Sequence, residues 1–192
     1  TTLMRVITGI YAQYEGEIYF EGEKVRFHTT RESQDKGIAI IHQELNMPVN
    51  LSIAEYMFLG RMPVTKVGTV KRKVAAERCK DLLTTVEIER DPRTKISELT
   101  VAEQQLVEIA RALSLNSKLI IMDEPTSALN KNEAANLFKI IRNLKQQEVT
   151  IIYISHKMDE IFEITDRITI MRDGRVIGTK PTKSFTHEEI VM

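Results

Sequence analysis

The sequence contains few of the residues that mark cross-linked, membrane-spanning or strongly charged proteins. Cys79 is the only cysteine in 192 residues, which excludes an intrachain disulfide framework and a zinc cluster built on cysteines. No apolar run approaches the ~20 residues of a membrane-spanning helix. Equal counts of 27 basic and 27 acidic residues argue against a nucleic-acid-binding tail or a polybasic membrane anchor. With 42% hydrophobic residues, the chain has the composition of one globular domain with a sizeable core.

Helix starts are indicated by pairs with the spacing of a capping box, in which a polar residue and a residue three positions later cap the first turn. These pairs are Ser52 with Glu55, Thr100 with Glu103, Thr186 with Glu189 and, in a weaker version, Asn130 with Glu133. Apolar residues follow at helical spacing. One such stripe includes Cys79, so we expect its thiol to be buried and inert.

Two hairpins and three buried strands are also predicted. Residues 18–20 and 24–27 flank one turn, and residues 168–171 and 175–177 flank another that contains Asp173 and Gly174. The apolar runs 38–41, 119–122 and 151–154 do not alternate with polar residues, which is typical of a parallel sheet buried on both faces. Helical stretches separate them, as parallel crossovers require. Residues 47–95 interrupt this order and are interpreted as part of a helical insertion.

Each of the three buried runs ends in a pair of polar residues. The pairs are His42-Gln43, Asp123-Glu124 and Ser155-His156. Because ligands bind at the carboxyl ends of strands in open parallel sheets, the pairs are candidates for one site. The simpler alternative is that strands merely end in polar residues.

The chemistry of these pairs suits phosphoryl transfer. Asp123 can hold Mg²⁺, a hard cation that prefers oxygen ligands, and Glu124 can polarise an attacking water. His156 can donate a hydrogen bond to the transferring phosphoryl group. Thr1 and Thr2 open a helix and fit the end of a phosphate-binding loop, G-x-x-x-x-G-K-[ST], although two threonines at that place are also an ordinary helix cap.

Taken in order, these motifs make the chain resemble the ATP-binding subunit of an ABC transporter, and more closely the first ATPase domain of the bacterial monosaccharide importers. The resemblance covers essentially the whole chain. It rests on residues 1–4 (end of Walker A), 41–45 (glutamine loop), 51–60 (sugar-importer pattern), 98–113 (signature motif and helix), 119–124 (Walker B), 127–130 (D-loop) and 154–156 (histidine switch).

The resemblance implies an α/β fold with a P-loop NTPase (RecA-like) core, a mainly parallel sheet, an ABC helical subdomain and a small antiparallel hairpin element. We expect residues 1–192 to form a single ABC ATPase domain that lacks its N-terminal strands and phosphate loop. Residues 1–43 and 114–192 would form the nucleotide-binding core, and residues 44–113 the helical subdomain with the signature motif. Without the loop's glycines and lysine, residues 1–192 alone are expected to show no measurable turnover.

The resemblance also implies ATP and Mg²⁺ as cofactors and a role for each matching residue. Thr1, Gln43 and Asp123 would serve Mg²⁺, and Thr2 would contact the α-phosphate. The implied catalytic residues are Glu124 as general base, His156 at the γ-phosphate, and Gln43 as the sensor of the metal.

The signature motif departs from the family's Leu-Ser-Gly-Gly-Gln. Thr100, Val101, Ala102 and Glu103 stand at its last four positions and would cap the ATP of a second ATPase domain in a head-to-tail dimer. Glu103 places a carboxylate at a helix N-terminus, where it would repel a γ-phosphate unless it turns away. The capping box predicts that it folds back onto the backbone of Thr100.

The implied function is ATP-driven sugar import, with the protein bound peripherally at the cytoplasmic face of the inner membrane. Its expected partners are permease subunits, which residues 46–55 would face, and the second ATPase domain. A periplasmic sugar-binding protein would act indirectly, and no nucleic acid is expected. One alternative is an ABC ATPase that acts on ribosomes or DNA, for which a long coiled or basic insertion is missing. Another is an inactive fragment without the Walker A lysine.

Overall fold

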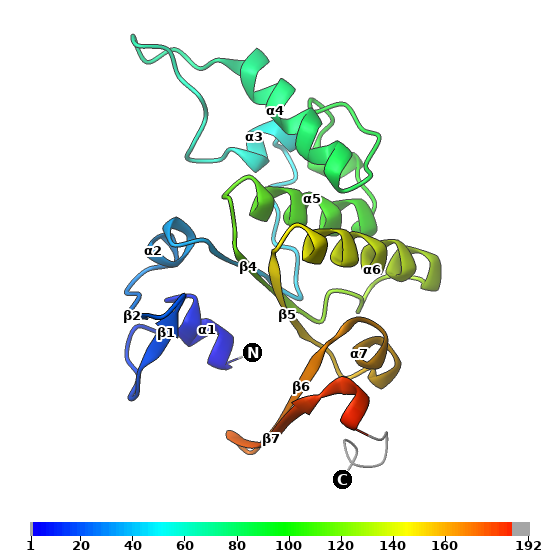
Figure 1. Ribbon diagram of the computed structural model, residues 1–192. Coiled ribbons are helices and arrows are strands. Elements are labelled where there is room, and N and C mark those ends of the chain that lie inside the picture. Colours follow the sequence, from blue (N-terminus) through cyan, green and yellow to red (C-terminus); the bar gives the residue numbers. More distant parts are fainter. Residues whose placement is uncertain (1, 186–192) are drawn as a thin grey trace.

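The central element of the fold is a parallel sheet. The computed structural model describes residues 2–185, and its sheet has the order β3-β4-β5 (Figure 1). The strands are β3 (Ile38–Ile41), β4 (Leu119–Asp123) and β5 (Thr150–Ile154). In register, Ile120 of β4 lies between Ala39 of β3 and Ile151 of β5. The three apolar runs therefore form the predicted parallel sheet, and all five residues of β4 are buried.

Side chains of the sheet alternate between two separate cores. Ala39, Ile41, Ile120 and Met122 pack into the larger core, which includes the apolar faces of the helices that follow β3 and β4. Ile38, Leu119 and Ile121 pack into a smaller core with Met4 and Phe27 on the opposite face. Burial on both faces explains the continuous apolar runs of β3 and β4. The prediction of a fully buried strand is wrong for β5, which has a single strand neighbour in the described sheet and whose residues are only partly buried against the two cores.

Helices surround this sheet. They are α1 (Thr2–Ile7), α2 (Thr30–Asp35), α3 (Ile53–Met57), α4 (Arg72–Thr85), α5 (Val101–Leu113), α6 (Lys131–Gln146) and α7 (Met158–Ile164), with 3-10 turns η1 (Ile96–Glu98) and η2 (Thr182–Ser184). The capping boxes predicted at Ser52, Thr100 and Asn130 are confirmed. The pair Thr186 and Glu189 lies outside the described residues.

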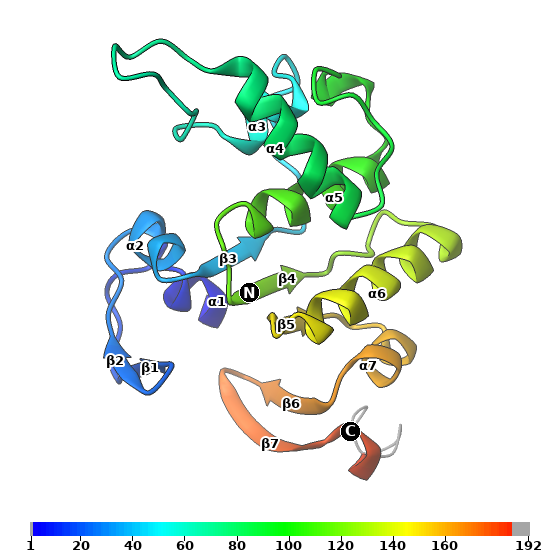
Figure 2. The same ribbon diagram turned by 45° about the horizontal axis from the view of Figure 1, so that its top comes forward.

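Helices α3, α4 and α5 pack together at one end of the molecule (Figures 1 and 2). Ile53 and Met57 of α3, Cys79 and Leu83 of α4 and Val107 of α5 are almost completely buried in the larger core. The thiol of Cys79 is therefore buried, as its stripe predicted. None of the described helices is long and apolar enough to span a membrane.

The two hairpins form where the sequence predicted them, with different strand limits. β1 (Ile18–Phe20) pairs with β2 (Glu23–Val25), and β6 (Arg167–Arg172) pairs with β7 (Arg175–Pro181). The prediction of a strand over 24–27 is wrong at both ends. Glu21 and Gly22 both have positive φ angles, 51° and 81°, so they form a tight two-residue turn that brings Glu23 opposite Phe20.

Candidate functional site

The carboxylate of Glu124 lies at the centre of the site. Nε2 of Gln43 donates a hydrogen bond to its Oε2 at 3.1 Å, and Nδ1 of His156 lies 3.1 Å from its Oε1. An ionised carboxylate is only an acceptor, so the imidazole donates in this contact. Each of the three residues follows a different strand of the parallel sheet, and the structure thus brings an amide, a carboxylate and an imidazole together.

A sharp change of backbone direction after β4 orients the carboxylate of Glu124. Glu124 has φ = 49°, in the left-handed region that residues other than glycine rarely occupy. Its N–H donates to the carbonyl of Ile154 at 2.9 Å, and its own carbonyl accepts from the N–H of Ser127 at 3.1 Å. Strained backbone of this kind persists only where surrounding contacts hold it, and it is frequent at functional sites.

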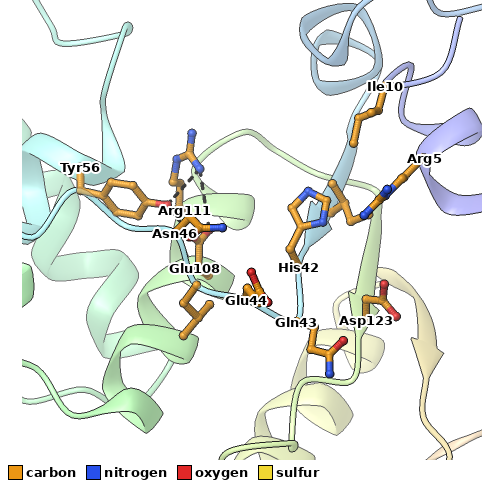
Figure 3. Close-up of a pocket in the computed structure, with 12 residues that line it drawn as sticks. Arg5, Ile10, His42, Gln43, Glu44, Asn46, Tyr56, Glu108, Arg111 and Asp123 are labelled. Atoms are coloured by element: carbon orange, nitrogen blue, oxygen red, sulfur yellow. Dashed lines mark hydrogen bonds and ion pairs between the residues drawn. The ribbon is translucent and has the colours of Figure 1, made fainter. Parts of the chain in front are cut away.

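Asp123 has a different environment from Glu124. It is the last residue of β4, is only 4% exposed, and lines a cavity of about 620 Å³ with Gln43 and His42 (Figure 3). No described residue donates a hydrogen bond to its carboxylate. The carboxylate of Asp123 is therefore available to bind a cation. The amide oxygen of Gln43 is a second oxygen ligand of the type that Mg²⁺ prefers.

The oxygen ligands in this cavity fit a cation that takes only some of its ligands from the protein. No group of three or more His, Cys, Asp and Glu side chains able to hold a metal is found among residues 2–185. A magnesium ion bound through one carboxylate keeps several waters and completes its coordination with substrate phosphates. The residues present therefore suit Mg²⁺ that arrives with a nucleotide better than a permanently bound metal.

The far wall of the cavity carries a second polar cluster. Figure 3 shows Tyr56 of α3 and Arg111 of α5 opposite Arg5, Ile10 and Asp123. The Tyr56 hydroxyl donates a hydrogen bond to Glu108, and Nη1 of Arg111 donates to the same hydroxyl at 3.3 Å. Burial, followed by the charge of Glu108, raises the pKa of Tyr56. We did not predict this cluster, because its members come from two helices and form no motif.

The signature residues lie at the start of α5. The N–H of Thr100 donates to Oε2 of Glu103 at 2.8 Å, which confirms that this carboxylate folds back onto the backbone. Arg90 also holds it, with Nε 2.7 Å from Oε1 and Nη2 3.3 Å from Oε2. Its hydrogen bond to Arg90 lowers the pKa of Glu103 against the opposing effect of burial, and the Thr100 hydrogen bonds lower it further. The charge that would repel phosphate is thus already neutralised.

The structure does not bring the signature residues to Glu124. Val101 lines a smaller pocket of about 350 Å³ together with Gln43 and residues 127–129. Ala102 is half-buried on α5, and no hydrogen bond joins residues 100–103 to Glu124 or His156. Thr2 is exposed at the start of α1, and Thr1 lies outside the described residues.

Comparison with known sequences gives a consistent result. The family described as "ABC transporter" matches residues 1–127. A putative ribose/galactose/methyl galactoside import ATP-binding protein of Geobacillus kaustophilus is 47% identical over 192 residues, which cover all of this chain and 38% of the relative. A galactose/methyl galactoside import ATP-binding protein of Clostridium tetani is 48% identical over 194 residues, with the same shares covered. The chain thus spans less than two fifths of the length of these relatives.

Solved structures agree on the architecture. The ADP conformation of the ATP-binding cassette MJ1267, from an ABC transporter, matches 99% of this chain and 77% of its own length, with a TM-score of 0.76 and 26% identity. The dimeric post-hydrolysis state of the cassette MJ0796, bound to ADP and phosphate, matches 96% and 81%, with a TM-score of 0.78 and 24% identity. The second likeness supports the fold alone.

Proposed function

The chain belongs to the ABC transporter family, and from that premise we propose that it is an ATP-binding and ATP-hydrolysing domain that drives sugar import through a membrane permease. The observation that carries the proposal is the position of Glu124, whose carboxylate lies between Gln43 and His156 at the carboxyl edge of the sheet. Relatives named for the import of ribose, galactose and methyl galactoside favour monosaccharides as the cargo.

We propose Glu124 as the general base. Its carboxylate keeps lone pairs free to accept the proton of an attacking water, and the contacts to Gln43 and His156 hold it in place. His156, whose side chain is 71% exposed, is proposed to contact a γ-phosphate. Because a neutral imidazole has a single N–H, it donates to the phosphate either as the imidazolium or after its Nδ1 leaves Glu124. Thr2 stands at the start of α1, where an α-phosphate contact is proposed.

Asp123 and Gln43 are the proposed partners of Mg²⁺, together with Thr1. When bound, the ion neutralises charge on the phosphate oxygens. Asp123 suits this role because its carboxylate faces the cavity with no donor from the described residues. Gln43 contacts both the proposed base and the proposed metal region, which supports its assignment as the sensor that links them.

The division into subdomains remains part of the proposal. Residues 1–43 and 114–192 are assigned to the nucleotide-binding core, which includes the parallel sheet. Residues 44–113 are assigned to the helical subdomain, which is supported by the mutual packing of α3, α4 and α5.

The proposed partners are permease subunits and a second ATPase domain. Residues 46–55 are proposed as the face toward the permease, and within this range the apolar side chain of Val49 is 52% exposed. Residues 100–103 are proposed to cap ATP held by the second domain in a head-to-tail dimer, with Glu103 neutralised by Arg90. A periplasmic sugar-binding protein would act through the permease, and the protein would lie at the cytoplasmic face of the membrane.

Replacing Glu124 with glutamine tests the proposal. In the intact importer, Glu124→Gln should lower Mg²⁺-dependent ATP hydrolysis by at least about 100-fold, because an amide cannot accept the proton. ATP affinity should stay within about twofold, because Asp123 and the phosphate contacts remain. Steady-state hydrolysis and equilibrium binding of a fluorescent ATP analogue measure the two effects.

The matched control is Glu77→Gln on α4, which removes an exposed carboxylate far from the site and should leave both quantities unchanged. Hydrolysis should also stop when EDTA removes Mg²⁺. Undiminished hydrolysis by Glu124→Gln, or a loss of ATP affinity as large as the loss of rate, would contradict the assigned role.

A further inference from the structure

Next to the site, the carboxylate of Glu160 is almost surrounded by donors. Glu160 lies in the first turn of α7, and its side chain is 12% exposed. The hydroxyl of Thr126 is 2.8 Å from its Oε1 and 2.7 Å from its Oε2. The hydroxyl of Tyr153 donates to Oε2 at 2.7 Å, and that of Ser155 approaches the same oxygen at 3.3 Å.

Lys157 also belongs to this hydrogen-bond network. Its Nζ lies 3.2 Å from Oε1 of Glu160 and also donates to the carbonyl of Thr126 at 3.0 Å. Its N–H donates to the hydroxyl of Ser155 at 3.0 Å. The carboxylate is thus the common acceptor for groups from the segment after β4, from β5 and from the segment after β5.

These are the segments that carry Glu124 and His156. Thr126 comes two residues after Glu124, and Ser155 directly precedes His156. The left-handed backbone at Glu124 needs neighbouring contacts to persist, and Thr126, which is 1% exposed, is the anchored end of that turn.

The network favours the charged form of Glu160. Burial alone would raise the pKa of this carboxyl, but hydrogen bonds from Tyr153, Thr126 and Lys157 outweigh it and lower the pKa below the ordinary value of 4.5. Glu160 is therefore ionised at neutral pH and accepts several hydrogen bonds at once. A glutamine at this position has one acceptor oxygen instead of two and would turn its NH₂ group toward donors.

We infer that Glu160 is a positioning residue that holds the Glu124 and His156 segments at the separation which the proposed hydrolysis needs. The inference deepens the proposed function and rests on it. Glu160 does not contact either side chain itself; it acts through Thr126 and through Ser155 and Lys157. Because misplacement of catalytic groups by about 1 Å can cost about 100-fold in rate, such an anchor affects turnover more than substrate binding.

The test compares Glu160→Gln with Glu163→Gln on the same helix. Among the residues that the structure describes, the half-exposed Glu163 forms its ion pair with Arg142 on α6, 2.6 Å away, so its replacement removes one surface ion pair. In the intact importer, Glu160→Gln should lower kcat for MgATP at least about tenfold, with KM within about twofold of wild type. Glu163→Gln should retain wild-type values of both.

A second variant and a second readout keep the test decisive. Thr126→Val removes the hydroxyl that links Glu160 to the Glu124 segment while keeping nearly the same volume, and it should also lower kcat with little effect on KM. Hydrogen exchange in the nucleotide-free protein should be faster in Glu160→Gln at the amides of Ser127 and Lys157. Exchange at these amides should be unchanged in Glu163→Gln.

Folded Glu160→Gln and Thr126→Val proteins with kcat within about twofold of wild type would overturn the inference and leave the proposed function intact. Unchanged exchange at Ser127 and Lys157 would overturn it as well. Full activity of Glu124→Gln in the same assay contradicts the proposed function instead, so the two failures are distinguishable.

Discussion

At the scale of single residues, Glu103 shows how a structure neutralises an unfavourable charge. A carboxylate at the start of α5 would oppose an approaching phosphate, but its two oxygens are already occupied by the backbone of Thr100 and by Arg90. The capping-box spacing predicted the first contact because it depends on neighbours three residues apart. The second was not predictable, since Arg90 lies 13 positions away and no sequence pattern relates the two.

Cys79 provides a prediction at the same scale. Its thiol is completely buried on α4, and burial, with a smaller contribution from Asp91, raises its pKa to about 12. Because the thiolate is the reactive form, the native protein should not react with Ellman's reagent at pH 8 within an hour. In 6 M guanidinium chloride, one thiol per chain should react at once. Rapid reaction of the native protein would contradict the assignment of a buried, inert thiol.

At the scale of elements, strand positions were more predictable than strand limits. The apolar runs identified β3, β4 and β5 because contact with a core on both faces leaves an unbroken hydrophobic pattern, although β5 is only partly buried. The limits of β2 were wrong because they depend on the positive φ angles of Glu21 and Gly22, which set the register of the hairpin. The Asp173-Gly174 turn, by contrast, is a known signal and was located correctly.

The cap of α6 gives an element-scale prediction. Oδ1 of Asn130 accepts hydrogen bonds from the N–H groups of Asn132 and Glu133, both at 3.0 Å. Asn130→Ala should therefore lower the free energy of unfolding by about 1 kcal/mol. Asn132→Ala, in the first turn of the same helix, should change it by less than about 0.5 kcal/mol, because that side chain makes no cap. Urea denaturation measures both, and equal effects would contradict the capping role.

At the scale of the whole molecule, α1 is joined to the rest of the fold by a close backbone approach. Gly9 follows α1 with φ = 75°, and a Cβ added there would lie 2.6 Å from the carbonyl oxygen of Thr29 and 2.9 Å from Cβ of Phe27. Phe27 and Met4 belong to the smaller core, so this contact seats α1 against one face of the sheet.

We expect Gly9→Ala to lower the free energy of unfolding by about 3 kcal/mol, because strain at positive φ and steric overlap add together. Gly22→Ala is the matched control: it has φ = 81° but open space around the added methyl, and should cost about 1 kcal/mol. Thermal unfolding monitored by circular dichroism compares the two. Equal decreases in the free energy of unfolding would show that the close approach between Gly9 and Thr29 does not contribute to the effect.

The sequence by itself determined the class of fold, the order of its parallel strands and hairpins and the residues proposed for chemistry, but not the helices α2 and α7. Periodicity, caps and strand-end polar pairs depend on residues close together in the chain, so Gln43, Asp123, Glu124 and His156 were all identifiable. Their assigned roles stay predictions. The tertiary structure alone decided that Glu124 is the residue shared by the amide and the imidazole, while Asp123 faces the cavity without a donor. It also brought Arg90 to Glu103 and Thr126 to Glu160, because these contacts form only when distant segments pack together.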